Sequence, residues 1–119
     1  MVAGILLVED DNEVREVLCE AAKATGHEST CVGTFREGLE EIRSGRYQLL
    51  LSNVRLPDGN GYDLAEQAVQ AGIKAVLISG HPDEFGVLEM RALAHLRKPF
   101  DIDEMTAMVA AHVGVALRD

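Results

Sequence analysis

The chain has 119 residues, of which 47% are hydrophobic, and it carries a formal net charge of −9 at pH 7. This length suits a single domain over residues 1–119, with enough apolar surface to bury a core. The acidic balance disfavours direct binding of nucleic acid, which needs a basic surface. No apolar run has the length of a membrane span and no basic leader precedes the first one, so we expect a cytoplasmic protein without membrane contact.

Short apolar runs alternate with helical patterns along the whole chain. Strands are expected at residues 5–8, 27–32, 47–52, 75–78 and 94–97. Helical spacing of apolar residues follows each strand, over about 14–25, from the capping box at 34–37 to about 44, over about 61–71, over about 84–93, and from the cap at 101–104 to 113. This alternation predicts an α/β fold of the (βα)5 type, a five-stranded parallel sheet.

The two cysteines are Cys19 and Cys31, and neither has another cysteine or a histidine near it at the spacing of a metal-ligand set. In a reducing cytoplasm, free cysteines behave as small hydrophobic residues. We therefore expect both to be buried as thiols and not to form a disulfide.

Polar side chains follow four of the expected strands, at the point where each strand ends. Glu9 and Asp10 follow the first strand, Asn53 the third, Ser79 the fourth and Lys98 the fifth. Ligands of open parallel sheets bind outside the carboxyl ends of the strands, where the strand order reverses. We expect these side chains to converge on one crevice there.

The chemistry of these residues suits a phosphoryl group. Adjacent Glu9 and Asp10 repel each other unless a cation lies between them, and oxygen ligands of this kind suit Mg²⁺. Lys98 adds a positive charge and Ser79 a hydroxyl donor, which together with a cation can hold the oxygens of a phosphoryl group. The nucleophile is missing, because Asn53 has the shape of an aspartate without its charge.

Over essentially its whole length the sequence resembles the receiver domains of response regulators. Four segments carry the resemblance: ILLVEDD at 5–11, LSNVRLPDGNG at 51–61, LISG at 77–80 and KPF at 98–100. Each segment alone is weak, but the four in this order are specific. The resemblance implies a doubly wound, flavodoxin-like sheet with strand order 2-1-3-4-5.

The resemblance also implies a metal set and a phosphoryl site. Asp10 would bind Mg²⁺ directly with Glu9 in support, and the side chain at position 53 and the backbone carbonyl of Arg55 would complete the set. Ser79 would hydrogen-bond the phosphoryl group and Lys98 would pair with it. The motif has aspartate where this chain has Asn53, so Mg²⁺ binding is expected to be weakened.

Further roles are implied by the same family for four positions. His95 stands where the family often has an aromatic switch residue that acts with Ser79, although a half-buried structural histidine fits equally well. The peptide bond before Pro99 is expected to be cis. His81 and Arg55 stand where the family adjusts the lifetime of the phosphoryl group.

The implied function is a two-component phosphorelay module, not an enzyme beyond its own phosphotransfer. It would accept phosphate at position 53 from a histidine kinase or a histidine phosphotransfer protein and then change its binding face toward an effector or an output domain. Two hypotheses remain for Asn53: a blocked receiver held in the inactive state, or a phosphorylation-independent pseudo-receiver that docks proteins. A flavin carrier fits less well, because residues 9–11 are acidic and aromatic residues make up only 4% of the chain.

Overall fold

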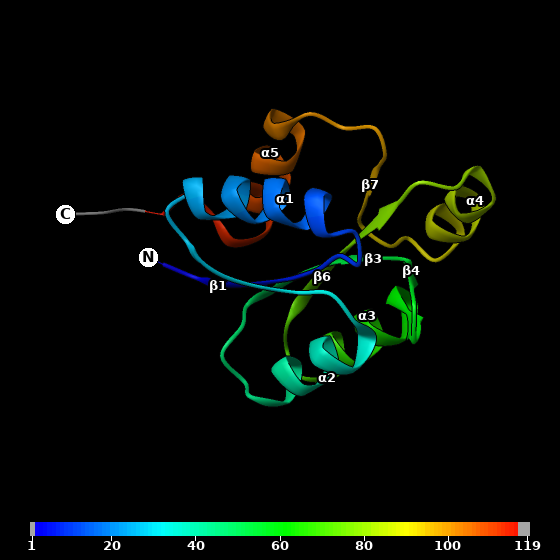
Figure 1. Ribbon diagram of the computed structural model, residues 1–119, viewed down its shortest axis with the longest axis horizontal. Helices are drawn as coiled ribbons and strands as arrows, with labels where there is room; N and C mark the ends of the chain where they lie inside the picture. The colour runs from blue at the N-terminus through cyan, green and yellow to red at the C-terminus, as the bar shows by residue number, and fades with distance from the viewer. Residues whose placement is uncertain (1, 117–119) are drawn as a thin grey trace.

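The computed structural model describes residues 2–116, and Figure 1 shows their arrangement. The main strands are β1 (Gly4–Val8), β2 (Glu28–Val32), β3 (Leu49–Asn53), β6 (Lys74–Ser79) and β7 (His95–Arg97). The helices are α1 (Asn12–Ala24), α2 (Phe35–Arg43), α3 (Gly61–Gln70), α4 (Pro82–Met90) and α5 (Ile102–Val113). Two short strands, β4 (Arg55–Leu56) and β5 (Gly59–Asn60), lie between β3 and α3.

The five main strands form one parallel sheet in the order β2-β1-β3-β6-β7. Since β6 and β7 are the fourth and fifth main strands along the chain, this is the predicted 2-1-3-4-5 order. The short strands β4 and β5 pair with each other in antiparallel orientation, away from the main sheet. The turn-forming residues of the loop at 56–61, Asp58 and Gly59 among them, predict a turn here but not this strand pair.

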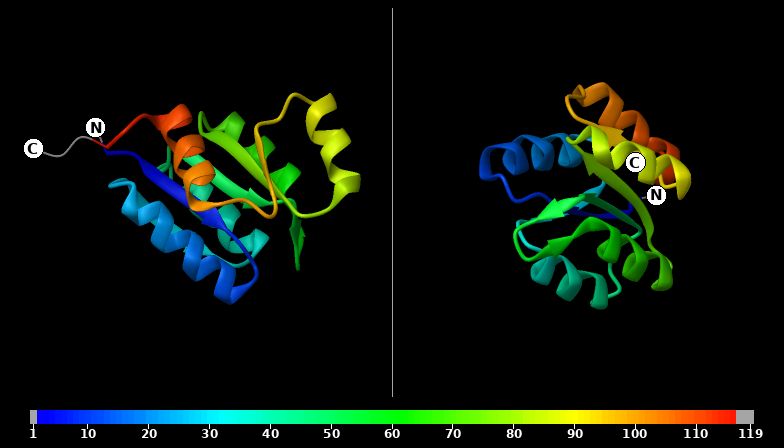
Figure 2. Two further views of the ribbon diagram at one scale, coloured as in Figure 1. Left: turned by 90° about the horizontal axis from the view of Figure 1, so that it is seen from above. Right: turned by 90° about the vertical axis from the view of Figure 1, so that its right-hand side faces the viewer.

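Helices cover both faces of the sheet, and the strands alternate their side chains between them. Ile5 and Leu7 of β1 pack in one core with α1 and α5, whereas Leu6 and Val8 pack in a second core with α2 and α3. Figures 1 and 2 show these two helical layers with the sheet between them. Burial on both faces explains why the central strands are almost continuously apolar.

Most helix boundaries follow the predicted capping residues. The side chains of Asp11, Thr34 and Asp101 accept hydrogen bonds from the third residue beyond each of them, at 3.0, 3.1 and 2.8 Å. Helix α4 lies two to three residues earlier than predicted. Pro82 suits the first turn of a helix, and Ala92 has a left-handed backbone (φ 54°) that ends the helical pattern.

None of the helices within residues 2–116 combines the length and the apolar composition that a transmembrane span requires.

The prediction for the two cysteines was wrong. Cys19 on α1 and Cys31 on β2 form a disulfide, with 6.1 Å between their Cα atoms. Both are partly buried against the core under α1 and α5, so the expected packing is present but the thiols are not free. The sequence argument rested on the redox compartment, whereas the packing of α1 beside the edge strand β2 brings the two residues within disulfide reach.

Reduction of this disulfide is expected to lower the free energy of unfolding by about 3 kcal/mol. The bond closes a loop between two residues that are 12 apart in the sequence, and closing such a loop removes chain entropy from the unfolded state. Urea unfolding with and without a dithiol reductant measures the loss. A double variant with alanine at positions 19 and 31 is the control and should not respond to the reductant. Titration of two free thiols in the native, non-reduced protein would contradict the disulfide.

Candidate functional site

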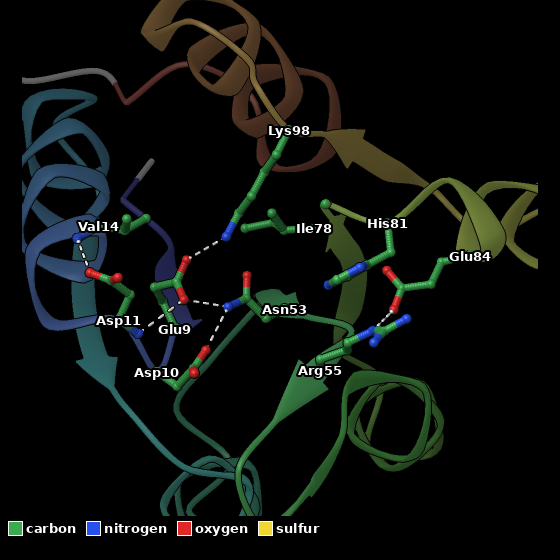
Figure 3. Close-up of a pocket in the computed structure, with 11 residues that line it drawn as sticks. Glu9, Asp10, Asp11, Val14, Asn53, Arg55, Ile78, His81, Glu84 and Lys98 are labelled. Atoms are coloured by element: carbon green, nitrogen blue, oxygen red, sulfur yellow. Dashed lines mark hydrogen bonds and ion pairs between the residues drawn. The ribbon is translucent and has the colours of Figure 1, made fainter.

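The carboxyl ends of the central strands lie level with one another. The pairing Val8 with Ser52, Ser52 with Leu77 and Ser79 with Arg97 sets this register. A cavity of about 290 Å³ opens at this edge of the sheet, lined by residues that include Glu9, Asp10, Asn53, Arg55, His81 and Lys98. Figure 3 shows these side chains converging from different strand ends. Four of the five side chains that the sequence placed here line the cavity, namely Glu9, Asp10, Asn53 and Lys98, whereas Ser79 does not.

The backbone holds Asn53 at the cavity floor. The N–H of Val54 donates to the Ile78 carbonyl at 3.0 Å, and the N–H of Gly61 donates to the Val54 carbonyl at 2.7 Å. A Cβ atom at Gly61 would collide with the carbonyl of Asn53. The glycine therefore lets the start of α3 close tightly over the end of β3, which fixes the direction of the Asn53 side chain.

Glu9 is the buried acid of the pair, with only 1% of its surface exposed. The Lys98 ammonium donates to its Oε1 atom at 2.9 Å, and the Asp11 N–H donates to Oε2 at 3.2 Å. A buried carboxylate is stable only with such partners. Lys98 and Glu9 thus form an ion pair across the cavity, between the ends of β7 and β1.

The Asn53 amide lies between the two acids. Its Nδ2 group donates to Glu9 Oε2 and, at 3.0 Å, to Asp10 Oδ1. Its Oδ1 atom is buried and has no hydrogen-bond partner among residues 2–116. The two N–H bonds of this amide relieve the carboxylate repulsion that the sequence argument assigned to a cation.

Ser79 lies at the predicted strand end, but it is not among the residues that line the cavity. The side chain is fully buried, and its Oγ atom donates to Glu84 Oε1 of α4 at 2.5 Å. The sequence argument missed this partner, because Glu84 was placed only at the start of a helix. Asp83 and Glu84 after Pro82 were the available signal, since acids favour the first turn of a helix.

The Arg55 side chain joins the same group on the far side of the cavity. Its Nε atom donates to Glu84 Oε2 at 2.8 Å, and its Nη2 atom lies 3.2 Å from Asp83. The hydrogen bond to Glu84 raises the pKa of Arg55 above its ordinary value. The Arg55 backbone carbonyl, predicted as a metal ligand, lies in the first residue of β4.

Two of the remaining predicted positions can be placed directly. The Lys98–Pro99 peptide bond is cis, as expected. His95 is half-buried, and its Nδ1 atom lies 2.9 Å from the Leu93 carbonyl, to which the ring N–H donates. This contact suits a structural histidine and leaves the predicted switch role as a hypothesis.

Within residues 2–116, no three His, Cys, Asp or Glu side chains gather closely enough to hold a metal ion. The predicted Mg²⁺ set has only two carboxylates, and its other ligands are an amide and a backbone carbonyl. It therefore differs from a group of three such side chains.

A family model described as the response regulator receiver domain matches residues 5–110. The chain belongs to this family. Receiver domains are signalling modules of two-component systems that bind Mg²⁺ and work with histidine kinases and output domains.

The curated relatives of this receiver include transcriptional regulators of bacteria. It is 33% identical over 115 residues to the DNA-binding transcriptional regulator NtrC of Escherichia coli K12, covering 92% of this chain and 24% of the relative. It is 29% identical over 113 residues to the DNA-binding response regulator MtrA of Mycolicibacterium paratuberculosis, covering 92% and 50%. The receiver therefore spans half or less of the length of these relatives.

Solved receiver structures share the fold. The response regulator TrrA of Thermotoga maritima, solved in complex with Mg²⁺ and BeF, superposes with a TM-score of 0.84 at 24% identity over 94% of this chain and all of that one. The receiver domain of nitrogen regulatory protein C in its apo form superposes with a TM-score of 0.79 at 29% identity, covering 92% and 93%.

Proposed function

We propose that this chain is a single receiver domain, residues 1–119, whose phosphoacceptor position holds Asn53. The observation that carries the proposal is the place of that side chain, at the floor of the strand-end cavity between Glu9, Asp10 and Lys98. An aspartate there would meet a lysine and an acidic pair, which are the groups that phosphoryl transfer needs. The amide cannot form an acyl phosphate, so the receiver is non-phosphorylatable and stays in its inactive state.

The partners proposed are those of a phosphorelay. A histidine kinase or a histidine phosphotransfer protein would present the phosphoryl group, in the cytoplasm where such kinases deliver it. An effector protein or an output domain would bind the surface of the receiver that changes on phosphorylation. The greater length of the NtrC and MtrA relatives supports an output domain, and the net charge of −9 disfavours direct nucleic-acid contact by this domain.

The residues at the cavity fit Mg²⁺, which prefers hard oxygen ligands and keeps several waters. Asp10 is exposed, Asn53 Oδ1 has no hydrogen-bond partner in the described part of the chain, and the Arg55 carbonyl follows two residues on. Bound Mg²⁺ would neutralise charge on the oxygens of a phosphoryl group. Glu9 would orient the set from its buried position, and Lys98, whose ammonium has three N–H donors, would pair with the phosphoryl group.

The alternative function, a phosphorylation-independent docking module, has one observation in its favour. The Asn53 amide already satisfies Glu9 and Asp10 by hydrogen bonds, so the acidic pair is stable without a cation. Such a module would hold one conformation permanently.

Beryllofluoride, which mimics a phosphoryl group on an acceptor carboxylate, separates the two functions. A ligand shifts a two-state equilibrium only through its differential affinity for the two states. We expect the chain to show no change in its amide resonances with Mg²⁺ and beryllofluoride, and Asn53→Asp to show shifts around Ser79, His95 and α5.

Asn60→Asp is the matched control, because it makes the same chemical change at the cap of α3 and keeps the oxygen that accepts the Asp63 N–H, although it loses the bond from the Asn60 amide to the Asp63 carboxylate. It should behave like the unmodified chain. If the unmodified chain already gives the resonance pattern of beryllofluoride-treated Asn53→Asp, the blocked receiver is excluded and the docking module takes its place.

A further inference from the structure

Glu84 is a buried acid that lies outside the acidic pair and has no role in the proposed metal and phosphoryl set. Only 7% of its surface is exposed. Carboxylates are seldom buried to this extent unless they are paired. Figure 3 shows Glu84 beside Arg55 at the side of the cavity opposite Glu9.

Both oxygens of this carboxylate have a specific donor. Oε1 accepts the hydroxyl of Ser79 at 2.5 Å, and Oε2 accepts the Nε–H of Arg55 at 2.8 Å. These donors come from different strand ends, Ser79 from β6 and Arg55 from the segment after β3. We call these three residues the Ser79–Glu84–Arg55 cluster.

The cluster also fixes the position of α4. The buried side chains of this helix are Glu84 and Leu88, and Leu88 packs with Val54, Ala65 and Leu77. Met90 is largely exposed. The two buried side chains of α4 thus make one apolar and one charged contact with the sheet, and the charged contact lies at the end nearest the cavity. Arg97 of β7 also pairs with Glu89 of α4 and lies over the Phe85 ring.

The chemistry of the serine hydroxyl links this contact to the cavity. A hydroxyl has a single O–H to donate. Ser79 can therefore donate to Glu84 or to an anion bound over residue 53, but not to both. An anion that draws the hydroxyl toward the cavity must break the bond to Glu84.

We propose that Glu84 is a positioning residue that keeps Ser79 turned away from the cavity and α4 in its present place, so that its carboxylate competes with a phosphoryl group for the Ser79 hydroxyl. This inference rests on the proposed function for the identity of the anion. The positioning of Ser79 and α4 by Glu84 does not depend on phosphorylation.

The first test measures the contact in the chain as it stands. Glu84→Gln keeps the shape and one acceptor but removes the charge, and a hydrogen bond to a charged group is worth more than a neutral one. Amide hydrogen exchange within α4 and at Ser79 should accelerate about tenfold. This is the ratio expected when the lost stabilisation lies at the lower end of the usual strength of a hydrogen bond to a charged group. Ser79→Ala removes the hydroxyl without adding volume, and like Glu84→Gln it should accelerate amide exchange in α4.

Asp83→Asn is the matched control. Asp83 is the neighbouring acid on α4 and also contacts Arg55, but it is exposed and does not contact Ser79. Its neutralisation should leave the exchange rates within about twofold, as exposed ion pairs contribute little. Equal exchange rates in the Glu84→Gln variant, the Asp83→Asn variant and the unmodified chain would overturn the proposal.

The second test measures the competition. In the Asn53→Asp background, Glu84→Gln should lower the beryllofluoride concentration that gives half of the resonance shift by about tenfold, whereas Asp83→Asn should not. If Asn53→Asp responds to beryllofluoride but Glu84→Gln leaves that concentration unchanged, Glu84 does not compete and the inference is wrong. If Asn53→Asp does not respond at all, the proposed function fails, and the exchange measurement alone decides whether Glu84 positions Ser79.

Discussion

Replacing Asn53 by aspartate is expected to convert the chain from an inert protein into one that takes up one phosphoryl group per molecule from acetyl phosphate in the presence of Mg²⁺. The unmodified chain should take up none. A carboxylate attacks phosphorus to give an acyl phosphate, whereas a carboxamide is a far poorer nucleophile and cannot give that product. The surrounding groups are already in place, since Lys98 and Asp10 both lie at the cavity that Asn53 lines.

Intact-mass measurement after incubation gives the stoichiometry directly. Asn60→Asp is again the control, because it adds a carboxylate to the same region of the chain but outside the cavity. It should gain nothing. A stoichiometric phosphoryl adduct on the unmodified chain would show that another side chain accepts phosphate, and the assignment of position 53 would then be wrong.

The strands, the helices and the set of strand-end residues could be predicted because they follow from local patterns, whereas the order of the strands in the sheet came from the resemblance to receiver domains. Buried parallel strands leave apolar runs such as residues 5–8, and caps such as Asp11 and Asp101 mark where helices begin. Once the strands are parallel, the residues after them must share one edge of the sheet. The convergence of Glu9, Asn53 and Lys98 then needs no knowledge of long-range packing.

The features that could not be predicted depend on contacts between segments distant along the chain. The Cys19–Cys31 disulfide requires the distance between α1 and β2, which no spacing in the sequence reveals. The same holds for Asp58, which was correctly predicted to lie in a turn. Its carboxylate also accepts the N–H groups of Phe35 and Arg36 at the start of α2, and the bond from Arg36 lowers the pKa of Asp58.

The direction of a buried hydroxyl is equally hidden from the sequence. Ser79 was placed correctly at the end of its strand, but a serine there can turn toward the cavity or toward α4. The choice depends on whether an acceptor is present on the helix, and Glu84 supplies one. The position of a side chain along a strand is therefore easier to predict than its hydrogen-bond partner.

Mg²⁺ is expected to bind at least tenfold more weakly to this chain than to its Asn53→Asp variant. Glu9 and Asp10 bring two negative charges to the cavity and Lys98 brings one positive charge, so the set carries −1, and an aspartate at position 53 would make it −2. At an effective dielectric constant near 20, one more charge at about 4 Å from a divalent ion is worth about 8 kcal/mol before hydration and salt reduce it. Retaining about a sixth of that value gives about tenfold in affinity.

The hydrogen bonds of Asn53 act in the same direction. Its Nδ2 group donates to Glu9 and Asp10, so an ion that binds Asp10 must compete with an N–H for the same carboxylate. Binding should weaken without vanishing, because the Asp10 carboxylate, the Arg55 carbonyl and Asn53 Oδ1 remain as oxygen ligands. Titration of Mg²⁺ followed by amide resonances near Asp10 measures both affinities, with Asn60→Asp as the control for added charge alone. Equal or tighter binding by the unmodified chain would mean that the ion does not contact position 53, and the proposed ligand set would have to be abandoned.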